Sequence, residues 1–255
     1  TKLDIAGTSL AISQKTDYPN EGRVEVSLNP EKPASFSLRL RIPTWTGKQF
    51  VPGKLYHYLN PSKPKWKISV NGKTVNPKTE LGFVLLERQW KKGDKVVLEL
   101  PMPTLLNECD KRVEDNHNRV AFTRGPFVLC AEEVDNGGAT QRFFLDKKPT
   151  VKKADLSRVN LPAGSFINVI SQANALTERG QPEERNLSLV PYYAWNNRKP
   201  GSMTIWFPTD PKLSIYDPHK LPKESIFKTL KASHTSDLDT VSAIGDGKEP
   251  RWSSG

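Results

Sequence analysis

The chain has 255 residues, including 21 prolines and 16 glycines, and its formal net charge is +10. This length predicts two domains, at roughly 100–200 residues per domain. No stretch of about 18 apolar residues occurs, so we expect no membrane span. Lys and Arg never run beyond two in a row and no nucleic-acid-binding motif accompanies them. We therefore interpret the charge as solvated strand edges and turns, not as a nucleic-acid site.

Alternation of apolar and polar residues dominates the first hundred positions and predicts short strands there. The clearest case is the stretch 34–42, where Phe36, Leu38, Leu40 and Ile42 would face inward. Asn71-Gly72 accepts positive φ at both residues, which favours a hairpin. The stretch 48–65, rich in proline and glycine, is typical of a long loop. The predicted strands of this part lie at residues 9–14, 23–28, 34–42, 65–70, 82–88 and 95–100.

A second group of strands is organised around residues 119–133, two apolar runs separated by Gly125-Pro126. Glycine permits the chain to turn and proline lacks an amide donor, so both suit a bend between strands. We expect this stretch to form a core strand of the second unit, and short helical turns at 155–158 and 223–230. The other strands of this part are predicted at residues 142–145, 166–170, 188–191 and 202–207.

These patterns predict an all-β protein of two antiparallel, jelly-roll-like β-sandwich domains in series, with an irregular C-terminal tail. Pro101 and Pro103 mark the boundary, which gives a first domain at 1–103 and a second at 104–208. Residues 209–255 contain several X-Pro pairs followed by a polar stretch with little to bury, as expected of a linker.

Acids, histidines and cysteines are present, but their spacing in the sequence matches no known catalytic or metal-binding motif. The acids beside the central strand, Glu132, Glu133 and Asp135, are predicted to be surface acids and turn caps. The histidines (His57, His117, His219 and His234) lack metal-ligand spacing. Cys130 lies in an apolar strand pattern, which favours a buried free thiol, although a bridge to Cys109 is left open. We therefore predict no catalytic residue and no metal site in this chain.

Two groups of aromatic residues are the candidate contact sites. One consists of Tyr192, Tyr193 and Trp195, beside Asn196, Asn197 and Arg198, and the other contains Trp45 and Tyr56 in the predicted loop. Aromatic faces with amide neighbours can stack on a sugar ring, and Tyr and Trp are equally enriched at protein interfaces. We favour a core or inter-domain contact for these residues and keep carbohydrate binding as the alternative.

Several motifs in order resemble glycoside hydrolase family 127, the β-L-arabinofuranosidase family. They span about residues 8–208 and include Tyr18-Pro19-x-x-Gly22, Leu38-Arg39-Leu40-Arg41-Ile42-Pro43-x-Trp45, Val70-Asn71-Gly72, Arg88-x-Trp90-x-x-Gly93-Asp94, Leu100-Pro101-Met102-Pro103, Arg124-Gly125-Pro126-Phe127-Val128 and Pro191-Tyr192-Tyr193-Ala194-Trp195-x-Asn197-Arg198. The resemblance is to the region that follows the family's catalytic domain.

The resemblance implies that the chemistry lies elsewhere. Family members carry their catalytic carboxylates and a cysteine-bound zinc in an (α/α)6 barrel, which would lie upstream of Thr1 as the partner of this region. The chain lacks the family's adjacent cysteine pair, so no catalytic residue is transferred and Cys130 is not a candidate nucleophile. We expect an accessory region of a glycan-degrading enzyme that is inactive alone. The alternative is a module with its own affinity for plant-type glycans.

Two further expectations come from resemblance alone. A periplasmic or extracellular location in a bacterium follows from the family. The tail from Ala232 to Ser254 is similar to the opening of a discoidin-like sugar-binding module. It would be the truncated start of such a module.

Overall fold

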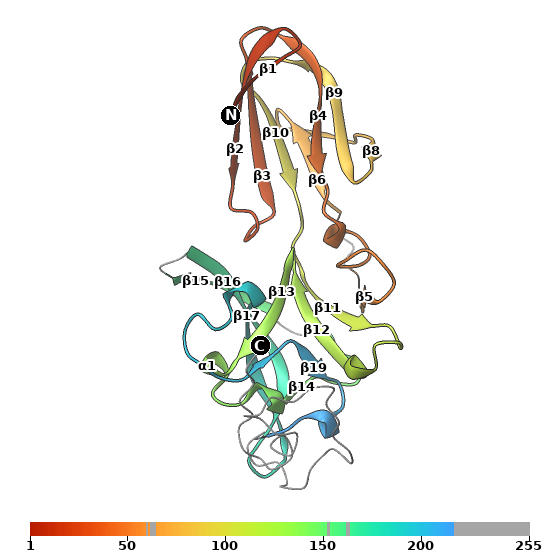
Figure 1. The fold of residues 1–255 in the computed structure, drawn as a ribbon, viewed down its shortest axis with the longest axis vertical. Helices are drawn as coiled ribbons and strands as arrows, with labels where there is room; N and C mark the ends of the chain where they lie inside the picture. Colours follow the sequence, from red (N-terminus) through yellow and green to blue (C-terminus); the bar gives the residue numbers. More distant parts are fainter. Residues whose placement is uncertain (60, 62–64, 152–153, 162–163, 217–255) are drawn as a thin grey trace, which may run out of the picture. The chain divides into compact units, whose positions relative to one another are not determined.

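The protein is described by a computed structural model over residues 1–59, 61, 65–151, 154–161 and 164–216 (Figure 1). The helical turn predicted at 223–230 and the discoidin-like stretch lie outside these residues. Within them the only α-helix is α1 (Glu133–Asn136), and no helix is long and apolar enough to cross a membrane. The protein is thus mostly β, with antiparallel sheets that form two β domains, as the sequence predicted.

Two sheets build the first domain. A six-stranded sheet has the order β1-β2-β3-β10-β6-β7, and a three-stranded sheet has the order β4-β9-β8. The strands of this domain are β1 (Lys2–Ile5), β2 (Thr8–Thr16), β3 (Arg23–Pro30), β4 (Ala34–Arg41), β6 (Lys67–Val70), β7 (Lys73–Val75), β8 (Thr79–Glu80), β9 (Phe83–Trp90) and β10 (Asp94–Glu99).

Alternation along β4 explains how the first core forms. Phe36, Leu38 and Leu40 pack against the core, while the intervening serines and arginines are exposed. The core also contains Trp90, which is fully buried and whose Nε1 donates a hydrogen bond to the Phe36 carbonyl at 3.0 Å. The strand predicted at 34–42 is therefore confirmed, with its apolar face inward.

The predicted loop 48–65 proved partly wrong, because it contains a strand, β5 (Tyr56–Tyr58). This strand pairs with β11 (Thr104–Cys109) of the second domain. Tyr58 is buried there and donates its hydroxyl hydrogen to the Trp45 carbonyl at 2.9 Å. Three residues are too few for alternation to show in a sequence, and the partner strand lies about fifty residues further on.

The second domain is built on one branched, ten-stranded antiparallel sheet whose main path is β14-β16-β17-β13-β12-β11-β5 (Figure 1). Three strands lie beside this path: β15 pairs with β16, β18 with β13 and β19 with β12. Besides β5 and β11, the strands of the sheet are β12 (Arg119–Arg124), β13 (Phe127–Glu132), β14 (Phe143–Phe144), β15 (Ala154–Leu161), β16 (Gly164–Leu176), β17 (Pro182–Pro191), β18 (Met203–Thr204) and β19 (Trp206–Pro208).

The stretch 119–133, predicted as a core strand of the second unit with a bend at Gly125-Pro126, forms two paired strands, β12 and β13, in the middle of this sheet. Thr123 pairs with Val128 and Arg124 with Phe127, so the turn consists of Gly125-Pro126. Gly125 has a φ of +54°, and a Cβ there would lie 3.0 Å from the Met102 sulfur. The core side chains of the hairpin are buried, among them Val120, Phe122, Leu129 and Ala131.

The helical turn predicted at 155–158 is wrong, because these residues belong to β15. All eight residues of β15 pair with β16 in a continuous antiparallel ladder. A partner strand satisfies the backbone groups that a lone turn would leave to water. Residues after 208 also bind this domain: Thr209 N donates to the Asn118 carbonyl at 2.7 Å, and Ile215 N donates to the Gln141 carbonyl at 3.0 Å.

Candidate functional site

The loop that follows β17 carries an exposed cluster of aromatic side chains. Tyr192, Tyr193 and Trp195 are 45%, 59% and 39% exposed. The rings of Tyr192 and Trp195 are nearly parallel, with centroids 5.9 Å apart and 12° between their planes. Tyr193 instead packs on Phe127, at 5.2 Å and 48°. The structure thus brings together, at one surface, the three aromatic residues singled out in the sequence.

Local backbone geometry explains why two of these rings lie face to face. Residues 192–194 form the 3₁₀ turn η4, closed by a hydrogen bond from Trp195 N to the Tyr192 carbonyl at 3.1 Å. Side chains three residues apart eclipse one another in such a turn. Asn196 then adopts a φ of +61° and redirects the chain. The parallel pair is therefore a product of the turn, and both rings stay open to solvent.

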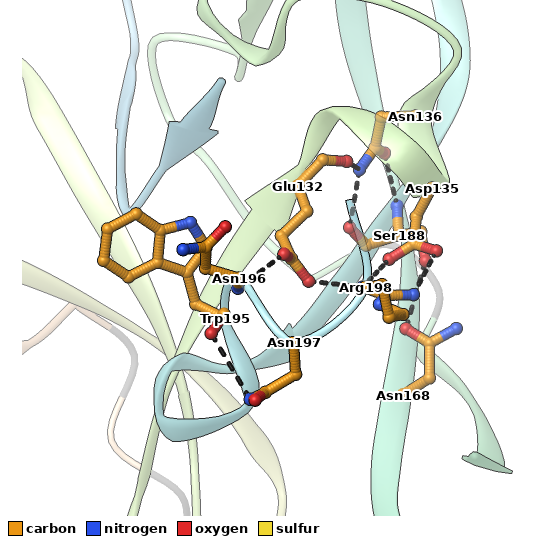
Figure 2. Close-up of polar contacts among 9 residues, drawn as sticks. All are labelled: Glu132, Asp135, Asn136, Asn168, Ser188, Trp195, Asn196, Asn197 and Arg198. Atoms are coloured by element: carbon orange, nitrogen blue, oxygen red, sulfur yellow. Dashed lines mark hydrogen bonds and ion pairs between the residues drawn. The ribbon is translucent and has the colours of Figure 1, made fainter. Parts of the chain in front are cut away.

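A buried carboxylate holds the loop in place (Figure 2). Glu132, at the end of β13, is only 3% exposed, and its Oε1 accepts a hydrogen bond from Asn196 N at 3.0 Å. Its Oε2 accepts one from Arg198 Nη2. The same guanidinium donates from Nη1 and Nη2 to the two carboxylate oxygens of Asp135, at 2.6 and 2.5 Å. The aromatic residues are thus tethered to the central hairpin.

The carboxylates of this network raise the pKa of Arg198 further. The hydrogen bond to Asp135 is the main cause that raises the pKa of Arg198, and the bond to Glu132 adds to it. A carboxylate is tolerated in such a buried place only when it is paired and hydrogen-bonded. Arg198 was predicted as a contact residue, but its Nη groups are occupied. It is therefore a positioning residue that fixes the loop behind the aromatic face.

Two further contacts fix the backbone around the loop. The side chain of Asn136 donates to the carbonyls of Glu132 and Ser188 at 2.7 and 3.0 Å, and it accepts from Ser188 N at 2.9 Å (Figure 2). At the far end of the loop, Glu133 accepts from Ser202 N and Oγ, both at 2.9 Å. A Cβ at Gly201 would lie 2.9 Å from the Glu133 Cβ, so glycine permits this approach. The loop is thus anchored on both sides.

The other predicted aromatics lie elsewhere. Trp45 is only 8% exposed and belongs to the first core, so its ring faces are not available to a ligand. Tyr56 is half-buried on β5 and packs on Trp206, with centroids 5.9 Å apart. In the sheet order, β13, β12 and β11 separate β5 from β17. Tyr56 and Trp45 are therefore not part of the aromatic surface at 192–195.

The family resemblance implies a zinc site in the catalytic barrel, and the described residues of this chain form no comparable site. In the described ranges no three His, Cys, Asp or Glu side chains converge to hold a metal. Both cysteines are free, Cys109 on β11 and Cys130 on β13. Burial raises the pKa of Cys130 to about 12, and burial also raises the pKa of Cys109. Thiols that stay protonated at neutral pH are poor metal ligands and poor nucleophiles.

Sequence reasoning missed the role of Glu132. This residue was predicted to be a surface acid or turn cap, and it is instead buried and ion-paired. A signal was present: Glu132 shares one face of β13 with Cys130, so it continues an inward-facing apolar pattern. A carboxylate on the buried face of a strand needs a cationic partner. In the structure that partner is Arg198.

Comparisons with known proteins agree with this architecture. Residues 1–102 match the family described as "Beta-L-arabinofuranosidase, GH127 middle domain", and residues 105–208 match "Glycoside hydrolase family 127 C-terminal domain". The non-reducing end beta-L-arabinofuranosidase of Bifidobacterium longum subsp. longum is 31% identical over 215 residues, which cover 78% of this chain and 30% of that protein.

Solved structures give the same result. A GH127 beta-arabinofuranosidase has a TM-score of 0.76 and 31% identity, covering 85% of this chain and 34% of its own. The GH127 beta-L-arabinofuranosidase of Geobacillus stearothermophilus T6 has a TM-score of 0.66 and 29% identity, covering 82% of this chain and 32% of its own. The chain spans about a third of the length of these relatives. It therefore consists, over residues 1–102 and 105–208, of the middle and C-terminal domains of glycoside hydrolase family 127.

Proposed function

We propose that this chain is the non-catalytic accessory region of a β-L-arabinofuranosidase-like glycoside hydrolase, and that it supports a catalytic barrel. The observation that carries the proposal is the pair of family matches, to a middle and a C-terminal domain that together make up about a third of each relative. In the family these two domains accompany the catalytic barrel. A periplasmic or extracellular location, with any zinc held by the barrel, belongs to the same proposal.

The aromatic surface at 192–195 suits a docking role. Tyr and Trp are enriched at protein interfaces, where a rigid apolar face gives contact area at low entropic cost. Here the Glu132–Arg198 contact and the Asn136 hydrogen bonds fix the loop before any partner arrives. We assign Tyr192, Tyr193 and Trp195 to the contact with the barrel.

A domain exchange tests the supporting role. The middle and C-terminal domains of the Bifidobacterium relative are deleted, and residues 1–216 of this chain are fused in their place. We expect the deletion to lower soluble yield and thermal midpoint, and the fusion to restore both. A fusion no better than the deletion contradicts the proposal. So does release of arabinose from an aryl arabinofuranoside by the chain alone.

Carbohydrate binding remains the second candidate, and one observation favours it. Tyr192 and Trp195 present two nearly parallel, exposed rings, and aromatic faces can stack on sugar rings. Under this alternative the isolated chain binds arabinan fragments in a calorimetric titration, and Trp195→Ala abolishes the binding. No binding by the isolated chain removes this candidate and leaves the supporting role.

A further inference from the structure

A separate cavity of about 450 Å³ opens beside the ends of β11 and β12. Its walls come from the end of β11, the turn at residues 116–120, the segment 147–150 and Thr209. Ligand pockets for small molecules have volumes of roughly 300–1,000 Å³. The cavity thus has the capacity for a single sugar or a molecule of similar size.

The charge in this cavity is unbalanced. Four cationic residues line it, namely Lys111, Arg119, Lys147 and Lys148, against one carboxylate, Glu108. Glu108 already has a partner, since its Oε1 lies 2.8 Å from His57 Nε2. Within the part of the chain that the structure describes, none of the four cations is in an ion pair. A concave surface lined by charges of one sign concentrates ligands of the other sign.

The remaining lining is amphipathic. Leu59, Val120 and Pro149 contribute apolar surface, whereas Asn116 and Thr150 contribute an amide and a hydroxyl group. A sugar ring presents C–H groups and hydroxyl groups together, so it matches such a mixture better than a bare inorganic anion does. A carboxylate on the sugar would satisfy the lysines and the arginine.

Two of the segments that line the cavity are fixed by hydrogen bonds. The Cys109 thiol has the carbonyls of Val113 and Asn116 within reach of its one hydrogen, at 3.6 and 3.3 Å. Thr209 donates to the Asn118 carbonyl from its backbone N at 2.7 Å and from its Oγ1 at 3.1 Å. A preformed site loses less entropy when a ligand binds.

We propose that this cavity binds a small carboxylated sugar, of the uronic acid class, through Lys147, Lys148 and Arg119. The choice of a sugar over another organic acid rests on the proposed function as part of a glycan-degrading enzyme. The site is distinct from the aromatic surface, because β12 and β13 lie between β11 and β17 in the sheet.

Titration calorimetry on the 255-residue chain with D-galacturonate, D-galactose and acetate tests the proposal. We expect galacturonate to bind, with an affinity that falls as salt is raised, and galactose and acetate to bind at least about tenfold more weakly. The double variant Lys147→Gln/Lys148→Gln should lose at least about tenfold in galacturonate affinity, equal to about 1.4 kcal/mol. The double variant Lys147→Arg/Lys148→Arg should retain it.

A matched control is Lys91→Gln/Lys92→Gln, which removes two charges from an exposed turn of the first domain and should bind like the parent. Equal affinity for galacturonate in the parent and the Lys147→Gln/Lys148→Gln variant would overturn the proposal. Acetate binding as tightly as galacturonate would also overturn it, since the cavity would then recognise only the anion. None of these results depends on the domain exchange, so a failure here is separable from a failure of the supporting role.

Discussion

The two domains bury different kinds of side chain. Among described residues the first domain buries one polar residue, Thr8, whereas the second buries eight. The eight are Asn107, Thr123, Arg124, Glu132, Asn136, Thr140, Arg142 and Ser171. The first core consists mainly of Leu, Val, Ile and Trp side chains packed between two sheets. The first domain is thus stabilised mainly by apolar packing, and the second domain by apolar packing together with buried polar residues.

Polar contacts of this kind mark the places where the molecule needs side chains in one defined geometry. Apolar burial is non-directional and holds a sandwich together in many side-chain arrangements. Hydrogen bonds and ion pairs require one geometry, and a broken member is costly in a low-dielectric interior. In the second domain two of these buried residues, Glu132 and Asn136, make such contacts around the loop that carries Trp195, Asn196 and Arg198 (Figure 2). The first domain is therefore held by its core, and the second positions a surface.

The largest loss of stability is expected from Trp90→Ala, which removes a large side chain from the first core. Removing a fully buried Trp leaves a cavity and should lower the free energy of unfolding by about 3–5 kcal/mol. The Phe36 carbonyl also loses its donor. Urea unfolding gives the value, and Leu81→Ala, at a residue 88% exposed, is the control. A loss no greater than that of the control would contradict an apolar core centred on Trp90.

Arg198→Met tests the stabilisation of the second domain by buried ion pairs. The change leaves Glu132 and Asp135 without their shared cation, and uncompensated buried charge costs about 3 kcal/mol or more. Urea unfolding again measures the loss. The control is Arg112→Met, which breaks an ion pair with Asp110 of 2.7 Å on the surface and should leave the midpoint unchanged. Similar midpoints for the two variants would show that the network does not hold the loop.

The sequence was informative about the apolar half of this comparison and less so about the polar half. Alternation is a local signal, and it located the strand at 34–42 and the strands within 119–133. The ion pair of Glu132 and Arg198 joins residues 66 positions apart. The phase of Glu132 on β13 signals burial, but nothing in the sequence singles out Arg198 as its partner, so the pairing appears only once the loop folds back on β13.

The aromatic residues show the same limit. Composition singled out Trp45 and Trp195 equally, yet one is buried and the other is 39% exposed. Trp45 is covered because it packs into the first core, and Tyr58 hydrogen-bonds to its backbone carbonyl. Trp195 stays exposed because a 3₁₀ turn stacks it on Tyr192 at the surface. Long-range packing decided the first case and local turn geometry the second.

A smaller loss in the free energy of unfolding, of about 1 kcal/mol, is expected when the pH is raised. Burial raises the pKa of Cys130 from an ordinary 9.0 to about 12. Above pH 9 the unfolded chain loses this proton and the folded chain keeps it, so stability falls as pH rises from 9 toward 12. The loss near pH 10 should be about 1 kcal/mol. Cys130→Ala should fall less steeply between pH 8 and 10 in urea titrations, and parallel curves would contradict a buried neutral thiol.

The smallest effect on stability is expected at the exposed aromatics. Tyr192→Ala and Trp195→Ala remove rings that face solvent, so each should change the free energy of unfolding by less than about 0.5 kcal/mol. In the fusion with the Bifidobacterium barrel, however, each should abolish the gain in thermal midpoint that residues 1–216 provide. Leu81→Ala, at a still more exposed residue of the first domain, should leave that gain intact. If the aromatic variants retain the full gain, then the buried network holds a loop that the barrel does not contact.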